Sequence, residues 1–596
     1  MSTSHLAVSP LLIALLTAVA TLLTGPTPRL QGGLSVLGSV GYLGAVLLLA
    51  NRVFAGETLV YQVSNWQAPF GIVAVADPLS TFMLVLTGVV SLPALVYAVD
   101  FMDEFSQRLS FHTLWHFMLA GVSGAFLTGD IFNLFVWFEV MLMSSYVLVL
   151  FYSGARHTRA ALSYVVLNLL GSAVMLLAIG GIYATTGTLN MADMARLLAA
   201  PDSGVAAVPT LGLGALLFSV FALKAGIVPF HFWVPAAYRA APAPVTAMLA
   251  GVVKKVGVYA IVRLYFTVFA AAEVGGFALP GLVPAGDGAF LGFFGPIFFV
   301  LGAASILLGG VGAVGREDID GMLAFSSIGQ VGFILLPLGV AATVPSLRVL
   351  GVTAALLYSF NHGLAKALLY LVSGTITDAV GSDRFETLGG VAGQAPLVAA
   401  AFFVGILALI GIPPLPGFFG KFFVFRTAAE AWALGAPGAS LAVGVALAGA
   451  VLTIAYFSRV WNEVFWGAAP AAVLAGFGGR LLETDGGDRA EEADDSEIPP
   501  AINEAAAPVQ AGVLVSLALA LVVTGVGFEF VLSAAEAAAE AALDTAGYIE
   551  AVSPATNAGE SGSAHSLLLL VAGPALSRGC RLLAAPRAAV ARWWER

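Results

Sequence analysis

The sequence contains little charge, few lysines and one cysteine. Asp, Glu, Lys and Arg make up only 10% of its 596 residues, whereas soluble domains carry roughly 25%. The single Cys580 excludes an intrachain disulfide, a cysteine zinc site and a cysteine-held iron–sulfur cluster. The chain also lacks a phosphate-binding glycine motif, a catalytic triad and a metal-ligand cluster. We therefore expect no cofactor, no metal site, no enzymatic reaction and no nucleic-acid partner.

Hydrophobic residues make up 59% of the chain, and runs long enough to cross a bilayer, roughly 20 residues, recur almost throughout. The sequence predicts an all-α polytopic membrane protein embedded in the lipid bilayer, with about fourteen transmembrane helices. The candidate spans are 7–24, 32–50, 78–99, 111–128, 131–152, 160–184, 211–229, 243–266, 290–314, 321–340, 350–373, 395–425, 438–466 and 510–533. A fifteenth candidate covers 565–584, and an interfacial amphipathic helix at 575–596 is its alternative.

Arginine placement predicts the orientation. If the N-terminus lies outside, most arginines fall in inside loops, as the positive-inside rule expects, and Arg263 is counted among the outer ones. This excess requires 565–584 to span, because the arginines of the C-terminal tail otherwise move outside. The acidic segment Thr484–Glu497 is then an inside loop, solvated by the cytoplasm or docking a partner. Residues 534–552 have a mild amphipathic pattern and are expected to lie along the outer surface.

All five lysines lie inside hydrophobic runs. They are Lys224, Lys254, Lys255, Lys366 and Lys421. A charge at the centre of a membrane helix costs roughly 2.5–3.5 kcal/mol, so such residues usually face a polar interior and mark ion paths. Because Lys254 and Lys255 are adjacent, we expect one to face that interior and the other to bond a carbonyl or extend to the interface.

The fifth span carries one acid at its start and another within its apolar run. Asp130 stands at the helix start and is interpreted as a cap, because a carboxylate suits that end of the dipole. Glu139 lies about 13 Å further along the helix, within the apolar run. A structural ion pair is one explanation for Glu139; a proton-carrying role is the one we favour. A Glu139–Lys224 pair that forms and breaks could load and release a proton.

Other polar residues recur at helical spacing in the predicted spans. His362 and Lys366 are four residues apart and share a face, which allows either a proton relay or a helix–helix hydrogen bond. Two further stripes are expected to form interhelical hydrogen bonds, with the lining of a water wire as the alternative. These stripes are Ser326 with Gln330, and Tyr164 with Asn168 and Ser172. The link after the seventh span carries His231, Trp233 and Tyr238, which either gate the link or pack there.

Two spans each carry a lysine beside prolines, and five spans separate them. One span ends in LKAGIVPF, and the other contains IPPLPGFFGKFFVF. Such paired, proline-interrupted segments predict an inverted repeat with broken helices at the membrane midplane.

Six segments of the chain resemble the antiporter-type subunits of respiratory complex I and of Mrp multisubunit cation/proton antiporters, and they resemble the Mrp D subunit most. They are GAFLTGDIFNLFVWFE (124–139), LKAGIVPFHFWVPAAYRAAPAPV (223–245), KVGVYAIVR (255–263), LAFSSIGQVGF (323–333), HGLAKALLYLVSG (362–374) and GIPPLPGFFGKFFVF (411–425).

The resemblance implies a proton-translocating membrane subunit of a multisubunit Na⁺ (monovalent cation)/H⁺ antiporter in the plasma membrane, working with other membrane subunits. It implies fourteen core spans, two inverted five-helix repeats and breaks in the seventh and twelfth helices. The implied proton path uses Glu139, Lys224, Lys255, His362, Lys366 and Lys421, with Asp130, Lys254, His231, Ser326 and Gln330 as accessory candidates. The alternatives are a proton-pumping subunit of an NADH-quinone oxidoreductase or membrane hydrogenase, and a scaffold whose lysines form structural pairs only.

The predicted organisation has six parts, and the chain departs from the family at four places. The parts are N-terminal spans (1–110), a first repeat (111–266), a second repeat (290–466), an acidic cytoplasmic loop (467–509), span fourteen with a surface helix (510–552), and a C-terminal extension (553–596). The departures are the additional Lys254, Asp320-Gly321 where the family often has a basic pair, the acidic loop and the extension. The second departure puts a basic contact at that helix end in doubt.

Overall fold

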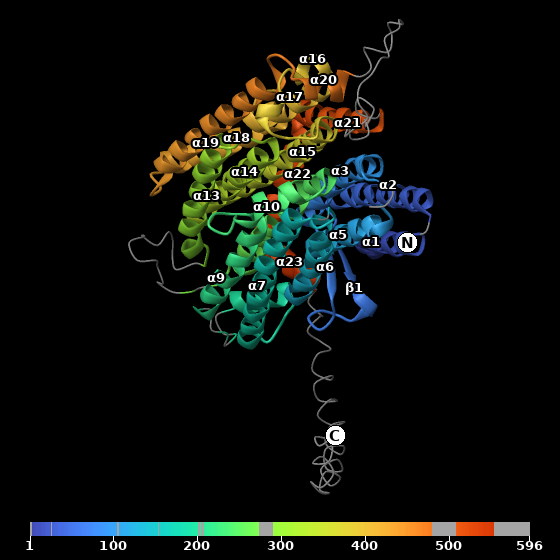
Figure 1. Cartoon of the computed structure of the whole chain (residues 1–596). Coiled ribbons are helices and arrows are strands. Elements are labelled where there is room, and N and C mark those ends of the chain that lie inside the picture. Colours follow the sequence, from blue (N-terminus) through green and yellow to red (C-terminus); the bar gives the residue numbers. More distant parts are fainter. Residues whose placement is uncertain are drawn as a thin grey trace, which may run out of the picture. The chain divides into compact units, whose positions relative to one another are not determined.

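The computed structural model describes residues 3–25, 27–103, 107–152, 154–200, 203, 205, 208–272, 274, 290–478 and 508–553. Residues Met1–Val552 form one compact unit (Figure 1). Three predictions lie outside the described residues. They concern the acidic segment 484–497, the fifteenth span at 565–584 and the extension after residue 553.

Helices make up nearly all of the first unit. In chain order they are α1 (Thr3–Leu23), α2 (Pro28–Val53), α3 (Pro78–Phe101), α5 (His112–Leu127), α6 (Ile131–Val149), α7 (Ala155–Thr186), α8 (Met191–Ala199), α9 (Val208–Ala225), α10 (Trp233–Ala240), α11 (Ala243–Met248), α12 (Lys255–Ile261), α13 (Phe290–Val314), α14 (Ile319–Thr343), α15 (Arg348–Val380), α16 (Val391–Gln394), α17 (Pro396–Ile410), α18 (Pro416–Ala433), α19 (Ala439–Val460), α20 (Ala471–Gly478), α21 (Pro508–Val526), α22 (Phe528–Leu543) and α23 (Thr545–Val552). Shorter helical segments are η1 (Val63–Asn65), η2 (Gln107–Phe111), η4 (Leu249–Val253), η5 (Val262–Val268), η6 (Pro345–Leu347), η7 (Phe385–Thr387) and η8 (Trp461–Phe465).

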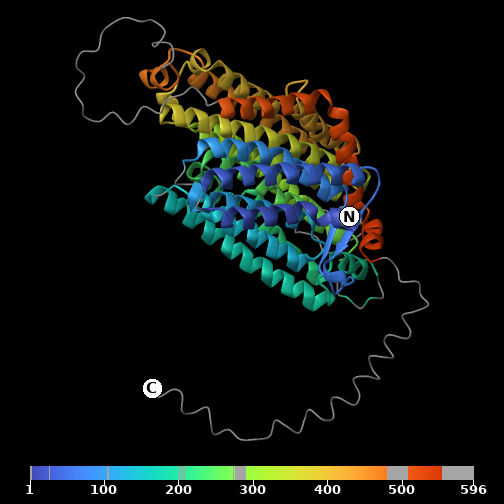
Figure 2. The same cartoon turned by 90° about the vertical axis from the view of Figure 1, so that its right-hand side faces the viewer.

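The predicted helical membrane fold is confirmed. In the described part of the chain, 12 helical segments are long and apolar enough to cross a membrane. The two other predicted spans correspond to α5, which has 16 residues, and to α17 followed by α18. The long helices run side by side, and α22 lies across their ends (Figure 2). Residues 534–552, predicted to be helical, lie mostly in α22 and α23, and α22 packs its buried alanine face on α3 and α15.

Both predicted helix breaks are present, and each begins at a glycine. Helix α9 ends at Ala225 and is followed by Gly226, whose φ is +70°. Helix α17 ends at Ile410 and is followed by Gly411, whose φ is +94°. L-residues with a side chain rarely adopt such φ values, so glycine lets the chain leave the helix here. Pro416 then starts α18 at a position where its missing N–H is not needed.

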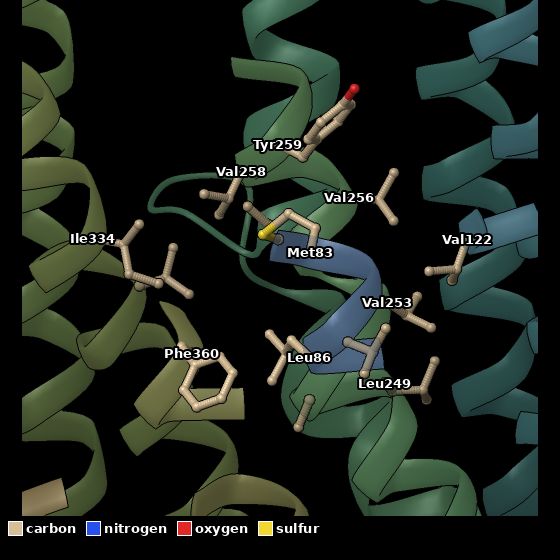
Figure 3. Close-up of a cluster of buried hydrophobic side chains, with 14 of the residues drawn as sticks. Met83, Leu86, Val122, Leu249, Val253, Val256, Val258, Tyr259, Ile334 and Phe360 are labelled. Atoms are coloured by element: carbon tan, nitrogen blue, oxygen red, sulfur yellow. The ribbon is translucent and has the colours of Figure 1, made fainter. Parts of the chain in front are cut away.

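The eighth span is the most enclosed of the candidate spans in the described part of the chain. It runs from α11 through η4 and α12 to η5, and its apolar window is 100% buried. Lys254 and Lys255 lie where the π-helical η4 passes into α12. Apolar side chains from α3, α5, α14 and α15 pack around this span, including Met83, Leu86, Val122, Ile334 and Phe360 (Figure 3). The two lysines are therefore held in a core that bulk solvent does not reach.

A short hairpin, which the all-helical prediction omitted, follows the second span. Strand β1 (Leu59–Gln62) pairs antiparallel with β2 (Val73–Ala76), with Leu59 opposite Ala76. Ala74 also forms an isolated bridge with Thr128, just after α5. The hairpin therefore ties the loop between spans two and three to the segment that begins the fifth span.

We expect a glycine contact between α13 and α14 to be essential for packing. A Cβ at Gly309 would lie 2.2 Å from the backbone nitrogen of Gly329, so Gly309→Ala must push the two helices apart. Overpacking of this kind costs roughly 1–3 kcal/mol, and we expect a lower midpoint of thermal unfolding for the purified protein. Gly180→Ala on α7 is the matched control, because nothing lies within 4 Å of its added Cβ. Equal midpoints for the two variants would contradict the expectation.

Candidate functional site

Lys224 lies in the last turn of α9, directly before the helix break, and is 1% exposed. Its Nζ donates a hydrogen bond of 3.1 Å to the hydroxyl of Tyr164 on α7. The same Nζ lies 5.5 Å from the centroid of the Tyr164 ring and 5.9 Å from that of Trp233. Trp233 stacks on Tyr164 at 4.7 Å between centroids, so two aromatic faces and one hydroxyl hold the ammonium group.

Glu139 and Lys224 do not form the direct pair that the sequence suggested. Glu139 is half-buried on α6 and accepts a hydrogen bond from the Ser172 hydroxyl. Glu139 and Lys224 form no salt bridge, although the two charges are close enough to interact. Their partners Tyr164 and Ser172 lie eight residues apart on α7. The polar stripe of α7 therefore separates the acid from the base, and a proton passing between them needs that stripe or water.

Lys255 is fully buried and contacts His362 of α15. Its Nζ lies 2.5 Å from His362 Nδ1 and donates a bond of 2.7 Å to the carbonyl oxygen of Ala250. The other ring nitrogen of His362, Nε2, has no hydrogen-bond partner within the described structure. The histidine thus joins α12 to α15, and one of its ring nitrogens remains available to a further donor or acceptor.

Lys254 is also fully buried. Its side chain contacts α14, whereas the side chain of Lys255 contacts α15. Its Nζ donates a hydrogen bond of 3.2 Å to the backbone oxygen of Ser327 on α14 and lies 6.0 Å from the Tyr238 ring centroid. Both lysines of the pair therefore bond a backbone carbonyl, and only Lys255 also contacts a titratable side chain, that of His362. Lys254 nevertheless stays close enough to Lys255, Lys366 and His362 to interact electrostatically with all three.

Lys366 forms hydrogen bonds within a polar network of the second predicted repeat and does not bond His362. Its Nζ donates to the Ser326 hydroxyl at 2.8 Å and to the Leu323 carbonyl at 2.9 Å. Ser326 and Gln330 both bond the hydroxyl of Tyr456 on α19, at 3.1 and 2.9 Å. Gln330 also accepts from Tyr358 and donates to Thr453. The predicted interhelical bonding of Ser326 and Gln330 is therefore present, but no sequence pattern indicated their tyrosine partners.

Lys421 lies in the second turn of α18, beyond the second helix break. Its Nζ donates a hydrogen bond of 3.1 Å to the carbonyl of Ile410, the last residue of α17. That carbonyl belongs to the negative end of a helix dipole and has no intrahelical partner, so a cation is favoured there. The ring of Phe333 lies 5.1 Å from the same nitrogen. The break thus supplies the site of this lysine.

Two accessory candidates lie away from these lysines. Asp130 is the N-cap of α6, and its side chain accepts a hydrogen bond of 2.7 Å from the backbone N–H of Asn133, as the sequence predicted. Burial raises the pKa of Asp130. His231 is half-buried in the link after α9 and stacks on Phe232. Burial lowers the pKa of His231, and neither residue contacts a lysine of the predicted path.

Arg263, counted among the outer arginines, is buried within the eighth span. It is 1% exposed, in η5, and its Nη2 lies 2.5 Å from Asp77 Oδ2. Its Nε donates to the Tyr259 hydroxyl at 3.2 Å, and its guanidinium lies 4.8 Å from the Tyr548 ring centroid. The hydropathy of the span contained no signal for this ion pair, because its two members are 186 residues apart.

Residues 128–453 match the family described as NADH:quinone oxidoreductase/Mrp antiporter, TM. The chain belongs to this family. It is 33% identical over 467 residues to the D subunit of the Na(+)/H(+) antiporter of Alkalihalophilus pseudofirmus, covering 78% of this chain and 87% of the relative. It is 36% identical over 484 residues to the N subunit of the NADH-quinone oxidoreductase of Desulforudis audaxviator, covering 78% and 88%. A chain of the Mrp complex from Dietzia sp. DQ12-45-1b has a TM-score of 0.75 at 28% identity, covering 93% and 100%.

Membership of the NADH:quinone oxidoreductase/Mrp antiporter family confirms the resemblance that six sequence segments indicated. It also agrees with the long apolar helices and makes this chain a multi-pass membrane protein. The family match begins at Thr128, next to the N-cap of α6, and ends at Thr453, which bonds Gln330. The matched region therefore contains all five buried lysines and Glu139.

Proposed function

We propose that this chain is the proton-translocating subunit of a multisubunit Na⁺ (monovalent cation)/H⁺ antiporter. The observation that carries the proposal is the series of buried ionisable groups from α6 to α18. A proton is loaded near Glu139 and Lys224, passes Lys255, His362 and Lys366, and leaves near Lys421. Lys254, Ser326 and Gln330 support this route, and water joins the groups that have no direct bond. The membrane potential supplies about 2.3 kcal/mol per charge per 100 mV, so no nucleotide is required.

Further membrane subunits are part of the proposed assembly. On α6, Phe132, Val136 and Met143 are exposed large hydrophobic residues, and Glu139 falls on the same face of the helix. A half-buried carboxylate facing lipid at this depth is costly. A partner subunit that covers this face shields Glu139 from lipid, and the proton path can continue from Glu139 into that subunit.

The orientation, location and organisation proposed for the chain follow from its sequence. The N-terminus lies outside and the acidic loop inside, in the plasma membrane, because this arrangement, with 565–584 as a fifteenth span, places the arginine excess inside. The two repeats comprise 111–266 and 290–466, and each contains one of the glycine-initiated helix breaks. The remaining proposed parts are the N-terminal spans (1–110), the loop (467–509), span fourteen with α22 and α23 (510–552) and the extension (553–596).

A second candidate function is a proton-pumping subunit of an NADH-quinone oxidoreductase or membrane hydrogenase. The 36% identity to the N subunit of an NADH-quinone oxidoreductase favours it. In that case too, this chain moves protons and holds no redox centre. The subunits that co-purify with the chain separate the two functions, since small antiporter subunits favour the first and quinone- or iron–sulfur-binding subunits the second.

The function is tested with the purified complex in sealed vesicles that contain a pH-sensitive dye. Adding Na⁺ after an imposed inside-acid gradient is expected to release protons from the vesicles, and adding choline is not. Repeating the assay with K⁺ and Li⁺ identifies the preferred cation. A complex that releases no protons with any of these cations, yet moves protons when a quinone is reduced, would transfer the function to the second candidate.

A further inference from the structure

The inner end of α14 carries an acid that lacks a basic partner. Asp320 is half-buried in the first turn of α14 and accepts a hydrogen bond of 2.7 Å from the Ser373 hydroxyl of α15. Within the described structure it forms no salt bridge, because the neighbouring Arg239 pairs with Asp318, at 3.0 Å. A third acid, Asp383, accepts a bond of 3.4 Å from the backbone N–H of Asp320. Asp320 thus joins a group of three carboxylates in which Asp318 interacts with Arg239 and Arg384, while Asp320 itself has no salt bridge in the described structure.

Three buried hydroxyl groups lie on the membrane side of Asp320 without hydrogen-bond partners in the described structure. They are those of Tyr238, Ser327 and Tyr370, whose residues are at most 1% exposed. The two tyrosine rings meet edge to face at 5.7 Å between centroids. The hydroxyls of Ser327 and Tyr370 lie close enough to interact with each other, but outside hydrogen-bond geometry. An unsatisfied buried hydroxyl costs roughly 1–3 kcal/mol. Three such groups in one place indicate bound water, which typically makes about three hydrogen bonds in a protein interior.

These hydroxyls stand between the acid and two lysines. On α15 the order is Ser373, Tyr370 and Lys366, at spacings of three and four residues, so all three share a face. The first and last of them are separated by about 10 Å along the helix axis. On the facing helix, Ser327 supplies the backbone oxygen that binds Lys254, and Ser326 binds Lys366. The three hydroxyls therefore lie between Asp320 and both lysines, where bound water would connect them.

We propose that Asp320 takes up protons from the inner aqueous phase and that water held by Tyr238, Ser327 and Tyr370 carries them to Lys254 and Lys366. A proton binds the Asp320 carboxylate, moves along the waters and ends on a neutral lysine amine, while the carboxylate is freed for the next proton. Asp383 supports the collecting role, because burial and the nearby Asp318 carboxylate raise the pKa of Asp383. The inference rests on the proposed proton transport and adds to its route a second entry, at Asp320, besides the one near Glu139 and Lys224.

The test compares the purified complex with variants in the vesicle assay. Asp320→Asn keeps the side-chain shape and cannot carry the proton, so cation-driven proton flux is expected to fall at least tenfold. Asp320→Glu retains a carboxyl group and is expected to recover most of the flux. Asp193→Asn is the matched control, because Asp193 also lies in the first turn of a helix but pairs with Arg196 on the surface. Lys224→Ala is measured in the same series, with assembly of each complex checked by size-exclusion chromatography.

Four outcomes separate the inference from the proposed function. Loss of flux in Asp320→Asn with recovery in Asp320→Glu supports the inference. Normal flux in Asp320→Asn, with flux lost in Lys224→Ala, overturns the inference and leaves the proposed function standing. Normal flux in both variants removes the proposed function as well. A cryo-EM map of the complex that shows no water beside the hydroxyls of Tyr238, Ser327 and Tyr370 also overturns the inference about Asp320.

Discussion

Replacing Lys224 with alanine is expected to abolish cation-driven proton flux while the complex still assembles. The ammonium group of Lys224 is held by the Tyr164 hydroxyl and two aromatic rings, so its loss breaks no direct salt bridge. A positioned proton-transfer group contributes roughly a hundredfold or more to the rate of its step, and the flux should fall by at least that much. The measurement is the initial rate of dye response in vesicles of equal protein content.

Arginine at the same position distinguishes a proton carrier from a structural cation. Lys224→Arg preserves the positive charge and the contact with the aromatic rings, but the guanidinium keeps its proton at any accessible pH. A proton-loading role therefore predicts that Lys224→Arg is as inactive as Lys224→Ala. Recovery of flux in Lys224→Arg would show that the site needs only a charge. Arg196→Lys, which changes an exposed ion pair with Asp193, serves as the control and should leave the flux unchanged.

Replacing Arg263 with alanine is expected to cause the largest loss of stability. The change leaves the Asp77 carboxylate, 3% exposed, without its ion-pair partner. Breaking a buried pair from one side costs roughly 3–5 kcal/mol, because the remaining charge is neither solvated nor paired. Arg263 also connects η5 to Tyr548 of α23, so its loss should loosen α22 and α23 from the bundle. The measurement is the fraction of protein that remains monodisperse in detergent after heating.

A double variant tests the cause of this loss. Asp77→Asn combined with Arg263→Met removes both charges, keeps a side chain that can cap α3, and should recover most of the stability. Arg52→Ala is the control, since Arg52 and Glu57 form an exposed pair at 3.3 Å, and such pairs contribute at most about 1 kcal/mol. If the double variant is as unstable as Arg263→Ala, the loss comes from packing and not from the unpaired charge.

The sequence by itself predicted the spans, the buried lysines and both helix breaks. These features depend on residues that are adjacent in the chain. A run of apolar residues meets the bilayer requirement locally, and a glycine with a following proline ends a helix locally, as after Ala225 and Ile410. Asp130 was assigned as a cap for the same reason, because an N-cap bonds a backbone group three residues away. The two-stranded hairpin was missed because its strands are four residues long.

Only the tertiary structure decided which groups meet. Helical spacing placed His362 and Lys366 on one face, but His362 contacts Lys255, and Lys366 contacts Ser326. Hydropathy placed Arg263 at a helix end, and the fold buried it against Asp77. A buried charge requires a partner, but which residue supplies it depends on how helices far apart in the chain pack. The sequence therefore determined that this membrane protein carries costly buried charges, and the packing of its helices determined how each one is satisfied.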